Sequence, residues 1–384
     1  MYFVHERGFR IALLTCALGA ISSLVSVITG PITTNLGWKY CFWILLPFCS
    51  VQFILMLLFS PESSYNRETM YGRTNENFEQ LYGFGMKVDQ TSSPSKENTD
   101  VLEHNTTRVP SDVSSRAVTP RKTFFQQLAL VDDIYSEDHL IRLFFAPFVV
   151  LTNIAAAWTI VMSGLIVGWY VSVSFIIAQW FSAPPYNYTP AAVGYLWVGP
   201  AVGGLVASLF MFAISDPLIK FCGKRNRGIY EPEFRLYPMT LCLIFTVLGL
   251  ALYGYGLQQY WNPLITSFVL GVMLFGILIG SIASSAYILD GFHSLSNEVF
   301  VASMAFKNLL FYSMSYYVNN WVAVRGPMQM FGVFAGISAF FILLGVPMFI
   351  WGKRYRSFWA RHNVMTFAGF KSRWWLLSVS CSFG

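Results

Sequence analysis

The chain of 384 residues is poor in charged side chains. Asp, Glu, Lys and Arg make up 11% of it, whereas a soluble globular domain has about 25%. This shortage excludes an ordinary water-soluble domain, because too little charge is left to cover its surface. The net charge of +6 is modest and lies on one set of connections. It therefore indicates orientation in a membrane and not binding to nucleic acid.

Catalytic and metal-binding patterns are missing as well. The five histidines lie outside the long apolar stretches, and the six cysteines show no CxxC spacing. The chain has no G-x-S-x-G elbow, no HExxH and no G-x-x-x-x-G-K-[ST] phosphate loop. We therefore expect no metal and no cofactor, and the sequence disfavours a membrane-embedded enzyme and an ATP-driven pump.

Long apolar stretches are what the chain has in abundance. At a rise of about 1.5 Å per residue, each can cross a hydrocarbon layer of about 30 Å. In lipid every backbone amide must bond within its own segment, so each stretch is predicted to be a helix. The fold class is then an all-α membrane protein with about eight spans and the lipid bilayer as its partner. The stretches are 11–32, 38–60, 143–181, 190–219, 237–257, 262–289, 297–324 and 327–351.

Basic residues mark alternate connections between these stretches. The positive-inside rule places such connections, and both termini, in the cytoplasm. It also favours one long helix over two spans at 143–181, because two spans would carry Lys224 and Arg225 to the outside. The basic sets are Arg7 and Arg10, Arg121 and Lys122, residues 220–236, and Lys353, Arg354 and Arg356.

A polar insert, residues 61–140, separates the second stretch from the third. It has too few apolar residues to bury a core, so we expect a largely disordered cytoplasmic loop. Apolar residues recur between 124 and 141, as in an amphipathic helix at the membrane interface. Residues 358–384 are predicted to form a cytoplasmic tail.

Short motifs along most of residues 2–357 form a specific set. They are Phe3-Val4-His5-Glu6-Arg7-Gly8, Gly37-Trp38-Lys39-Tyr40-Cys41-Phe42-Trp43-Ile44, Ser60-Pro61-Glu62-Ser63-Ser64-Tyr65-Asn66-Arg67, Ser215-Asp216, the run from Arg225 to Leu236, Tyr287-Ile288-Leu289-Asp290, Phe306-Lys307-Asn308, and Gly352-Lys353-Arg354-Tyr355-Arg356. Together they resemble the major facilitator superfamily, and within it the fungal drug:proton antiporter-like branch.

The resemblance implies a major-facilitator-type bundle, in which twelve helices form two six-helix halves. Residues 1–60 then correspond to the last two helices of the N-terminal half, and 141–357 to the C-terminal half. The first four helices have no counterpart here. The implied activity is transport of a small organic solute by alternating access, with protons as the coupling ion, in the plasma membrane. The alternative is a truncated, non-transporting fragment or a membrane scaffold or receptor, and we expect the chain alone to transport poorly.

Two polar residues inside a predicted span are candidates for solute contact, because such transporters bind near the bilayer midplane. Lys307 lies about ten residues inside its stretch, where a charge is costly unless it is paired or hydrated. With Asn308 it would face a wet cavity and contact an anionic group or a coupling carboxylate. Structural pairing or snorkelling toward the cytoplasm is the alternative for Lys307.

Four further residues are predicted to line the same cavity. Asn153 and Trp158, in the middle of the third stretch, offer an amide and a flat indole face. An interhelical hydrogen bond and packing are the alternatives for this pair. Tyr195 and Tyr287 are weaker candidates, since we favour an interfacial position for Tyr195 and packing for Tyr287.

Charged residues at the cytoplasmic ends are candidates for a gate. Asp216, Lys224 and Arg225 resemble the second copy of the family's cytoplasmic gating loop, whose charged pairs would hold the outward-facing state closed on the inside. Asp290 and Glu298, at the ends of adjacent stretches, would join that latch. Ordinary solvated loop charge is the alternative.

Small residues predict where helices approach closely. Glycines recur at small-xxx-small spacing, which allows close contact between membrane helices. Pro200 and Pro347 are expected to kink their helices. The glycine pairs are Gly164 with Gly168, Gly199 with Gly203, and Gly276 with Gly280.

Overall fold

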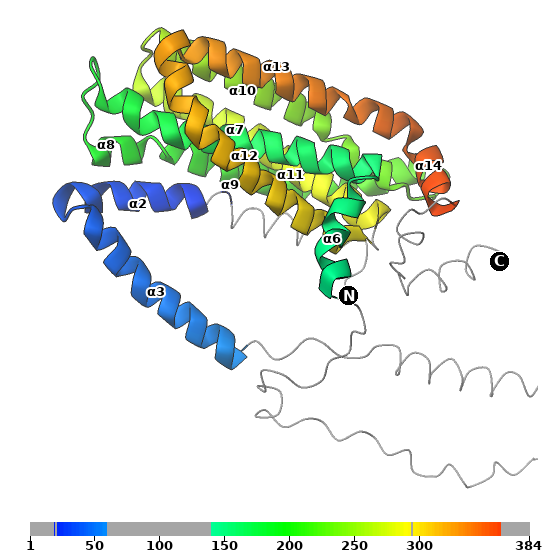
Figure 1. Ribbon diagram of the computed structural model, residues 1–384. Helices are drawn as coiled ribbons and strands as arrows, with labels where there is room; N and C mark the ends of the chain where they lie inside the picture. The colour runs from blue at the N-terminus through cyan, green and yellow to red at the C-terminus, as the bar shows by residue number, and fades with distance from the viewer. Residues whose placement is uncertain (1–18, 20, 60–139, 293–294, 362–384) are drawn as a thin grey trace, which may run out of the picture. The chain divides into compact units, whose positions relative to one another are not determined.

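The computed structural model describes residues 19, 21–59, 140–292 and 295–361, and the regular elements in them are helices (Figure 1). The predicted insert and tail lie outside these residues, apart from residue 140 and residues 358–361. The elements are α2 (Ser22–Asn35), α3 (Trp38–Phe59), α6 (Leu140–Val150), α7 (Ile154–Ser182), α8 (Pro190–Tyr195), α9 (Val198–Arg225), the 3₁₀ helix η2 (Pro232–Leu236), α10 (Met239–Gln258), α11 (Pro263–Gly291), α12 (Ser296–Arg325), α13 (Pro327–Leu343) and α14 (Gly345–Arg361).

Six segments among the described residues are long and apolar enough to cross a membrane. Two of the predicted stretches are not among them. The first stretch is described only from residue 19 onward, and α12 has 30 residues but carries Glu298, Lys307 and Arg325. The six segments are Trp38–Leu57, Ile154–Ser182, Pro190–Arg225, Pro232–Gln258, Pro263–Gly291 and Pro327–Trp359.

The prediction of one continuous helix over 143–181 is wrong. Helix α6 ends at Val150 and α7 begins at Ile154. Between them Asn153 has an extended backbone, and its side chain accepts hydrogen bonds from the N–H groups of Ala155 and Ala156 at 3.0 and 3.2 Å. This is an N-cap, which satisfies donors that the first turn of a helix leaves unpaired. The 29 residues of α7 are about 43 Å long, so α7 is long enough to cross the bilayer alone.

Two other predicted spans also contain a break. Leu196 and Trp197 separate α8 from α9, and Leu344 separates α13 from α14. The second break lies three residues before Pro347, where a proline removes a backbone donor. The first break likewise lies just before Pro200, in the first turn of α9, so both prolines follow a break in a predicted span.

The chain divides into two compact units. One consists of residues 1–44 and 139–384, and the other of residues 45–138. In the second unit the structure describes the remainder of α3, whose side chains from Leu45 to Leu57 are exposed. All the contacts described below lie within the first unit.

Helix α2 packs against α8 through glycines. A Cβ on Gly30 would lie 2.9 Å from the carbonyl oxygen of Pro190, and one on Gly194 would lie 2.8 Å from that of Ser26. The Ala191 N–H donates to Thr34 Oγ1 at 3.0 Å across the same contact. The two backbones therefore touch directly.

Other glycines allow the close helix contacts that the sequence predicts. Helix α12 packs along α7, where Phe306 lies against Gly164 and Leu310 against Gly168, so closely that a Cβ would overlap either side chain. Helix α11 is largely buried and packs against α7, α9 and α10. Gly199 and Gly203 let the α9 backbone reach that of α11. The prediction of close approach is confirmed.

Candidate gating site

The connection between α9 and α10 holds a compact turn followed by a buried 3₁₀ helix. Asn226 caps α9, and its Nδ2 donates to the carbonyl of Ile229 at 3.2 Å. Gly228, at φ +82°, adopts a left-handed conformation that suits glycine, and its N–H bonds to the carbonyl of Gly223. The chain then enters η2, whose five residues are all buried. Charged side chains that flank and occupy η2 are thus held close to the helix ends.

Arg235 of η2 joins two neighbouring helices. Its Nε donates to Asp290 Oδ2 of α11 at 2.7 Å, and its Nη1 donates to Ser215 Oγ of α9 at 3.2 Å. The side chains of Arg235 and Asp290 are only 2% and 3% exposed. The hydroxyl of Tyr230 donates to the same Asp290 oxygen at 2.6 Å. A buried charge is stable only when it is paired and hydrogen-bonded in this way.

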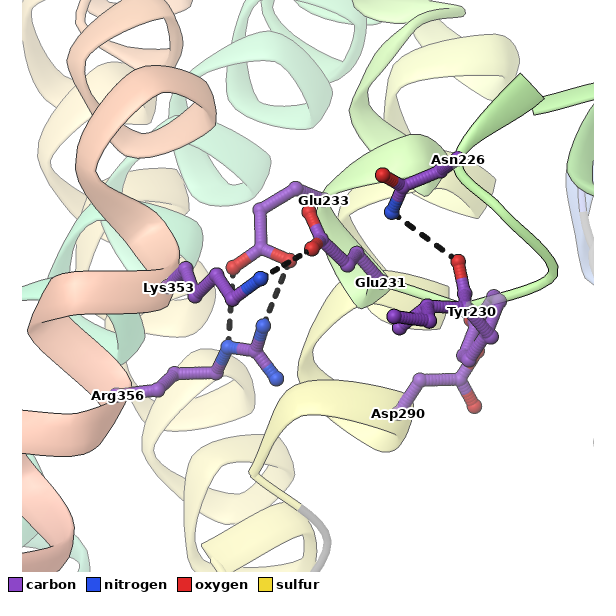
Figure 2. Close-up of polar contacts among 8 residues, drawn as sticks. Asn226, Tyr230, Glu231, Glu233, Asp290, Lys353 and Arg356 are labelled. Carbon is purple, nitrogen blue, oxygen red and sulfur yellow. Dashed lines mark hydrogen bonds and ion pairs between the residues drawn. The ribbon is translucent and has the colours of Figure 1, made fainter. Parts of the chain in front are cut away.

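Two acidic residues of the same connection bind α14. Arg356 donates from Nε and Nη2 to the two carboxylate oxygens of Glu233, at 3.0 and 2.8 Å. Lys353 Nζ donates to Glu231 Oε1 at 2.7 Å. Figure 2 shows Lys353 and Arg356 reaching from α14 toward these carboxylates, with Asp290 on the other side of the connection. The Glu233 pair is bidentate and shielded, whereas the Lys353 side chain is 71% exposed.

Gly352 makes room for the Glu233 carboxylate. A Cβ at Gly352 would lie 2.7 Å from Glu233 Oε1. The carboxylate therefore rests against the α14 backbone, one residue before Lys353.

These residues form one charge network, here called the connector network. It consists of Tyr230, Glu231, Glu233, Arg235, Asp290, Lys353 and Arg356. The hydrogen bond from Lys353 lowers the pKa of Glu231, while burial raises the pKa of Tyr230. The network and the bond from Arg235 to Ser215 tie α9, α11 and α14 to a single connection.

The structure brings one of the five predicted gating residues into this network. Asp290 is its acidic centre on α11. Asp216 is half-buried and directly follows Ser215, the residue that accepts from Arg235. Lys224 and Arg225 are exposed in the last turn of α9, where positive charge is favourable next to a helix C-terminus.

Glu298 lies in the first turn of α12, outside the connector network. Its side chain is half-buried. Its Oε2 atom is buried and has no hydrogen-bond partner among the residues that the structure describes. A buried acceptor of this kind is costly unless another state of the molecule supplies a donor.

Three of the predicted solute-binding residues are packed together instead. Trp158 is 7% exposed and Tyr287 fully buried, and their rings meet edge to face at 6.5 Å. The indole Nε1 of Trp158 donates to the carbonyl of Phe341 on α13 at 2.9 Å. Asn153 is the fully buried cap of α7, and it also accepts from the Tyr355 hydroxyl at 3.3 Å. The placement of Asn153 at mid-span is therefore wrong, because the helix begins immediately after it.

The other three candidates lie apart from that cluster. Tyr195 ends α8 and is 55% exposed, as an interfacial tyrosine would be. Lys307 is half-buried near the middle of α12, next to Phe306 in the α7 contact. Among the residues that the structure describes, Lys307 has no hydrogen-bond or ion-pair partner. Asn308 is exposed.

Sequence reasoning missed most of the connector network as a site. Glu231, Glu233, Arg235 and Arg356 were noticed as parts of motifs or as basic connections. The alternation of signs in Glu231-Pro232-Glu233-Phe234-Arg235 was the available signal, because such charges in a short loop need separate partners. No group of three or more His, Cys, Asp or Glu in the described ranges is arranged to hold a metal ion.

The comparisons with known proteins agree with this architecture. The model of the Major Facilitator Superfamily matches residues 1–294, and the chain belongs to this family. It is thus a multi-pass integral membrane protein of a transporter family and not an enzyme.

The curated relatives include fungal proteins. The uncharacterized MFS-type transporter C1271.10c of Schizosaccharomyces pombe is 25% identical over 390 residues, covering 97% of this chain and 67% of the relative. Protein HOL1 of Saccharomyces cerevisiae is 26% identical over 51% of this chain and 32% of its own length. The MFS-type transporter penM of Penicillium rubens is 30% identical over 45% of this chain and 34% of its own length. This chain therefore covers about two thirds of the first relative and one third of the others. No solved structure is significantly similar to it.

Proposed function

We propose that the protein moves a small organic solute across a membrane by alternating access, with protons as the coupling ion. Family membership supports the transport class. The observation that carries the proposal is Lys307, a half-buried ammonium near the middle of a membrane helix without a partner among the described residues. An intramembrane charge of this kind is costly and is usually retained for function.

Lys307 acts in this proposal as the contact for an anionic group of the solute or for a coupling carboxylate. Asn308, the next residue, supplies an amide beside it. Trp158, Tyr195, Tyr287 and Asn153 are left out of the solute contact, because their observed contacts explain them as packing, interfacial and capping residues.

The connector network and Glu298 are the proposed gate. Asp290 holds the end of α11 to η2 through Arg235, which also bonds to Ser215 of α9, while Asp216, Lys224 and Arg225 add further charge on α9. Glu298 has a buried acceptor that a donor from an opposing element would satisfy when that side closes. We further propose that residues 1–60 and 141–357 belong to opposite halves of the transport path, which the contact of α2 with α8 supports.

The test is flux in liposomes that contain the purified full chain. Fluorescein serves as an anionic probe and rhodamine 6G as a cationic one, with and without an imposed pH gradient. We expect slow fluorescein flux, in line with the poor transport expected of the chain alone, that still follows the gradient and disappears with a protonophore. Flux that is indifferent to the gradient refutes proton coupling. Absence of flux for both dyes, from protein with intact helical content, favours the scaffold or receptor alternative.

A variant pair assigns the role of Lys307. Lys307→Gln should reduce kcat/KM for fluorescein by about tenfold or more, since hydrogen bonds to charged groups contribute about 1.5–3 kcal/mol. Lys220→Gln, at an exposed lysine of α9, should leave it unchanged. Equal kinetics in both variants would show that Lys307 has a structural role. A plasma-membrane location, which the branch resemblance alone supports, is tested by imaging a fluorescent fusion in yeast.

A further inference from the structure

An apolar groove opens between the start of α10 and the bend that joins α13 to α14. Its volume is about 250 Å³. Apart from the Thr240 and Tyr237 side chains, its lining is hydrocarbon. The lining residues are Leu236, Tyr237, Met239, Thr240, Leu243, Ile342, Leu343, Gly345, Val346 and Phe349.

The groove follows from the bend at Leu344. Gly345 lies so close to Trp158 that a Cβ would be 2.8 Å from the indole ring, and Trp158 also bonds to the Phe341 carbonyl. These contacts hold the bend against α7. Farther along α14, Phe349 meets Tyr237 edge to face at 5.0 Å and closes one end of the groove. The hollow is therefore built by the helix contacts.

Two basic residues stand just beyond this closed end. On a helix, residues three or four apart share a face. Lys353 follows Phe349 by four residues, which places it on the same face about 6 Å beyond the groove along α14, and Arg354 is the next residue. Lys353 is 71% exposed and bonded to Glu231, and Arg354 is exposed. With Glu231 they carry a net charge of +1, because Arg356 is paired with Glu233.

We propose that this groove binds an anionic phospholipid, with one acyl chain in the groove and the phosphate at Lys353 and Arg354. The surrounding medium of a multi-pass protein supplies such a ligand. A phosphate restores charge balance at the mouth of the groove, and the apolar lining matches a hydrocarbon chain. Basic residues at the cytoplasmic membrane surface attract anionic lipids by about 1 kcal/mol each. The site is separate from the proposed solute contact at Lys307, and it does not depend on transport activity.

Native mass spectrometry of the delipidated full chain tests the proposal. Dioleoyl phosphatidylserine and dioleoyl phosphatidylcholine are compared at equal concentration, with glycerol-3-phosphate as a headgroup without acyl chains. We expect several-fold higher occupancy by phosphatidylserine and no retention of glycerol-3-phosphate. Arg354→Gln should weaken phosphatidylserine binding about fivefold, the equivalent of about 1 kcal/mol, and leave phosphatidylcholine unchanged. Val346→Trp, which fills the groove, should reduce the retention of both lipids.

Lys220→Gln, an exposed charge on α9, is the matched control and should change nothing. Leu243→Phe fills the groove from α10 and replaces Val346→Trp if that variant loses helical content. Equal occupancy by the two lipids would overturn the anionic site. Retention of phosphatidylserine that is unchanged by both Arg354→Gln and the filling variant would overturn it too. Strong binding of glycerol-3-phosphate would show a site for free phosphate in place of a lipid site.

Discussion

Arg235 and Asp290 form an ion pair, with Nε and Oδ2 2.7 Å apart and both side chains almost fully buried. Removing one partner of a buried pair leaves an uncompensated charge and costs about 3–5 kcal/mol. We expect Asp290→Ala to lower the free energy of unfolding by about that amount, measured by thermal or denaturant unfolding in detergent. Replacing both partners, as Arg235→Met with Asp290→Leu, should recover much of the loss. A single variant as stable as the parent would contradict the described pairing.

The exposed pair of Lys353 and Glu231 should behave differently with pH. Its hydrogen bond lowers the pKa of Glu231 in the folded protein, so the pair stabilises the fold fully above the ordinary glutamate pKa of 4.5. That contribution is lost as the pH falls through the lower folded-state value. The stability difference between the parent and Glu231→Gln should stay constant, below about 1 kcal/mol, from pH 8 to 5 and vanish in stronger acid. A difference that grows on acidification would refute this.

The contact of Gly168 with Leu310 limits side-chain size between α7 and α12. Gly168→Ala forces its methyl group into Leu310, and overpacking of this kind costs about 1–3 kcal/mol. The same substitution in a Leu310→Ala background should cost less, as a double-mutant cycle would reveal. Gly336→Ala on α13, where a Cβ meets nothing within 4 Å, is the control and should be neutral or slightly stabilising. Equal losses of stability in Gly168→Ala and Gly336→Ala would contradict the close contact between α7 and α12.

Trp158 is expected to support the bend between α13 and α14 and not to bind solute. Trp158→Phe removes the hydrogen bond to the Phe341 carbonyl and should cost about 1 kcal/mol of stability, seen in thermal unfolding. Its KM for a transported dye should equal that of the parent. Trp351→Phe, at a 56% exposed indole, is the control for loss of an indole. A raised KM with unchanged stability would show that Trp158 contacts the solute.

The sequence predicted the helices well because apolar length is a local property. The second stretch, 38–60, became α3 almost residue for residue. The break at Asn153 was missed because Leu151-Thr152-Asn153 interrupts an apolar run without proline or glycine. Asn153 itself was the signal, since asparagine before a helical run is a favoured N-cap.

The sequence could not predict which partners the charged residues bind, because those partners depend on tertiary contacts. Glu233 and Arg235 are two residues apart, yet one bonds to α14 and the other to α11. No local pattern decides between those partners. Asp290 was a candidate from its place at a helix end, but its pairing with Arg235 became evident only once η2 was seen to be buried.

The meeting of Gly30 and Gly194 has a mechanical consequence. Because backbone and not interlocking side chains forms this contact, any side chain at Gly30 or Gly194 would force α2 and α8 apart. The bond between Ala191 and Thr34 then sets the resting register of the two helices.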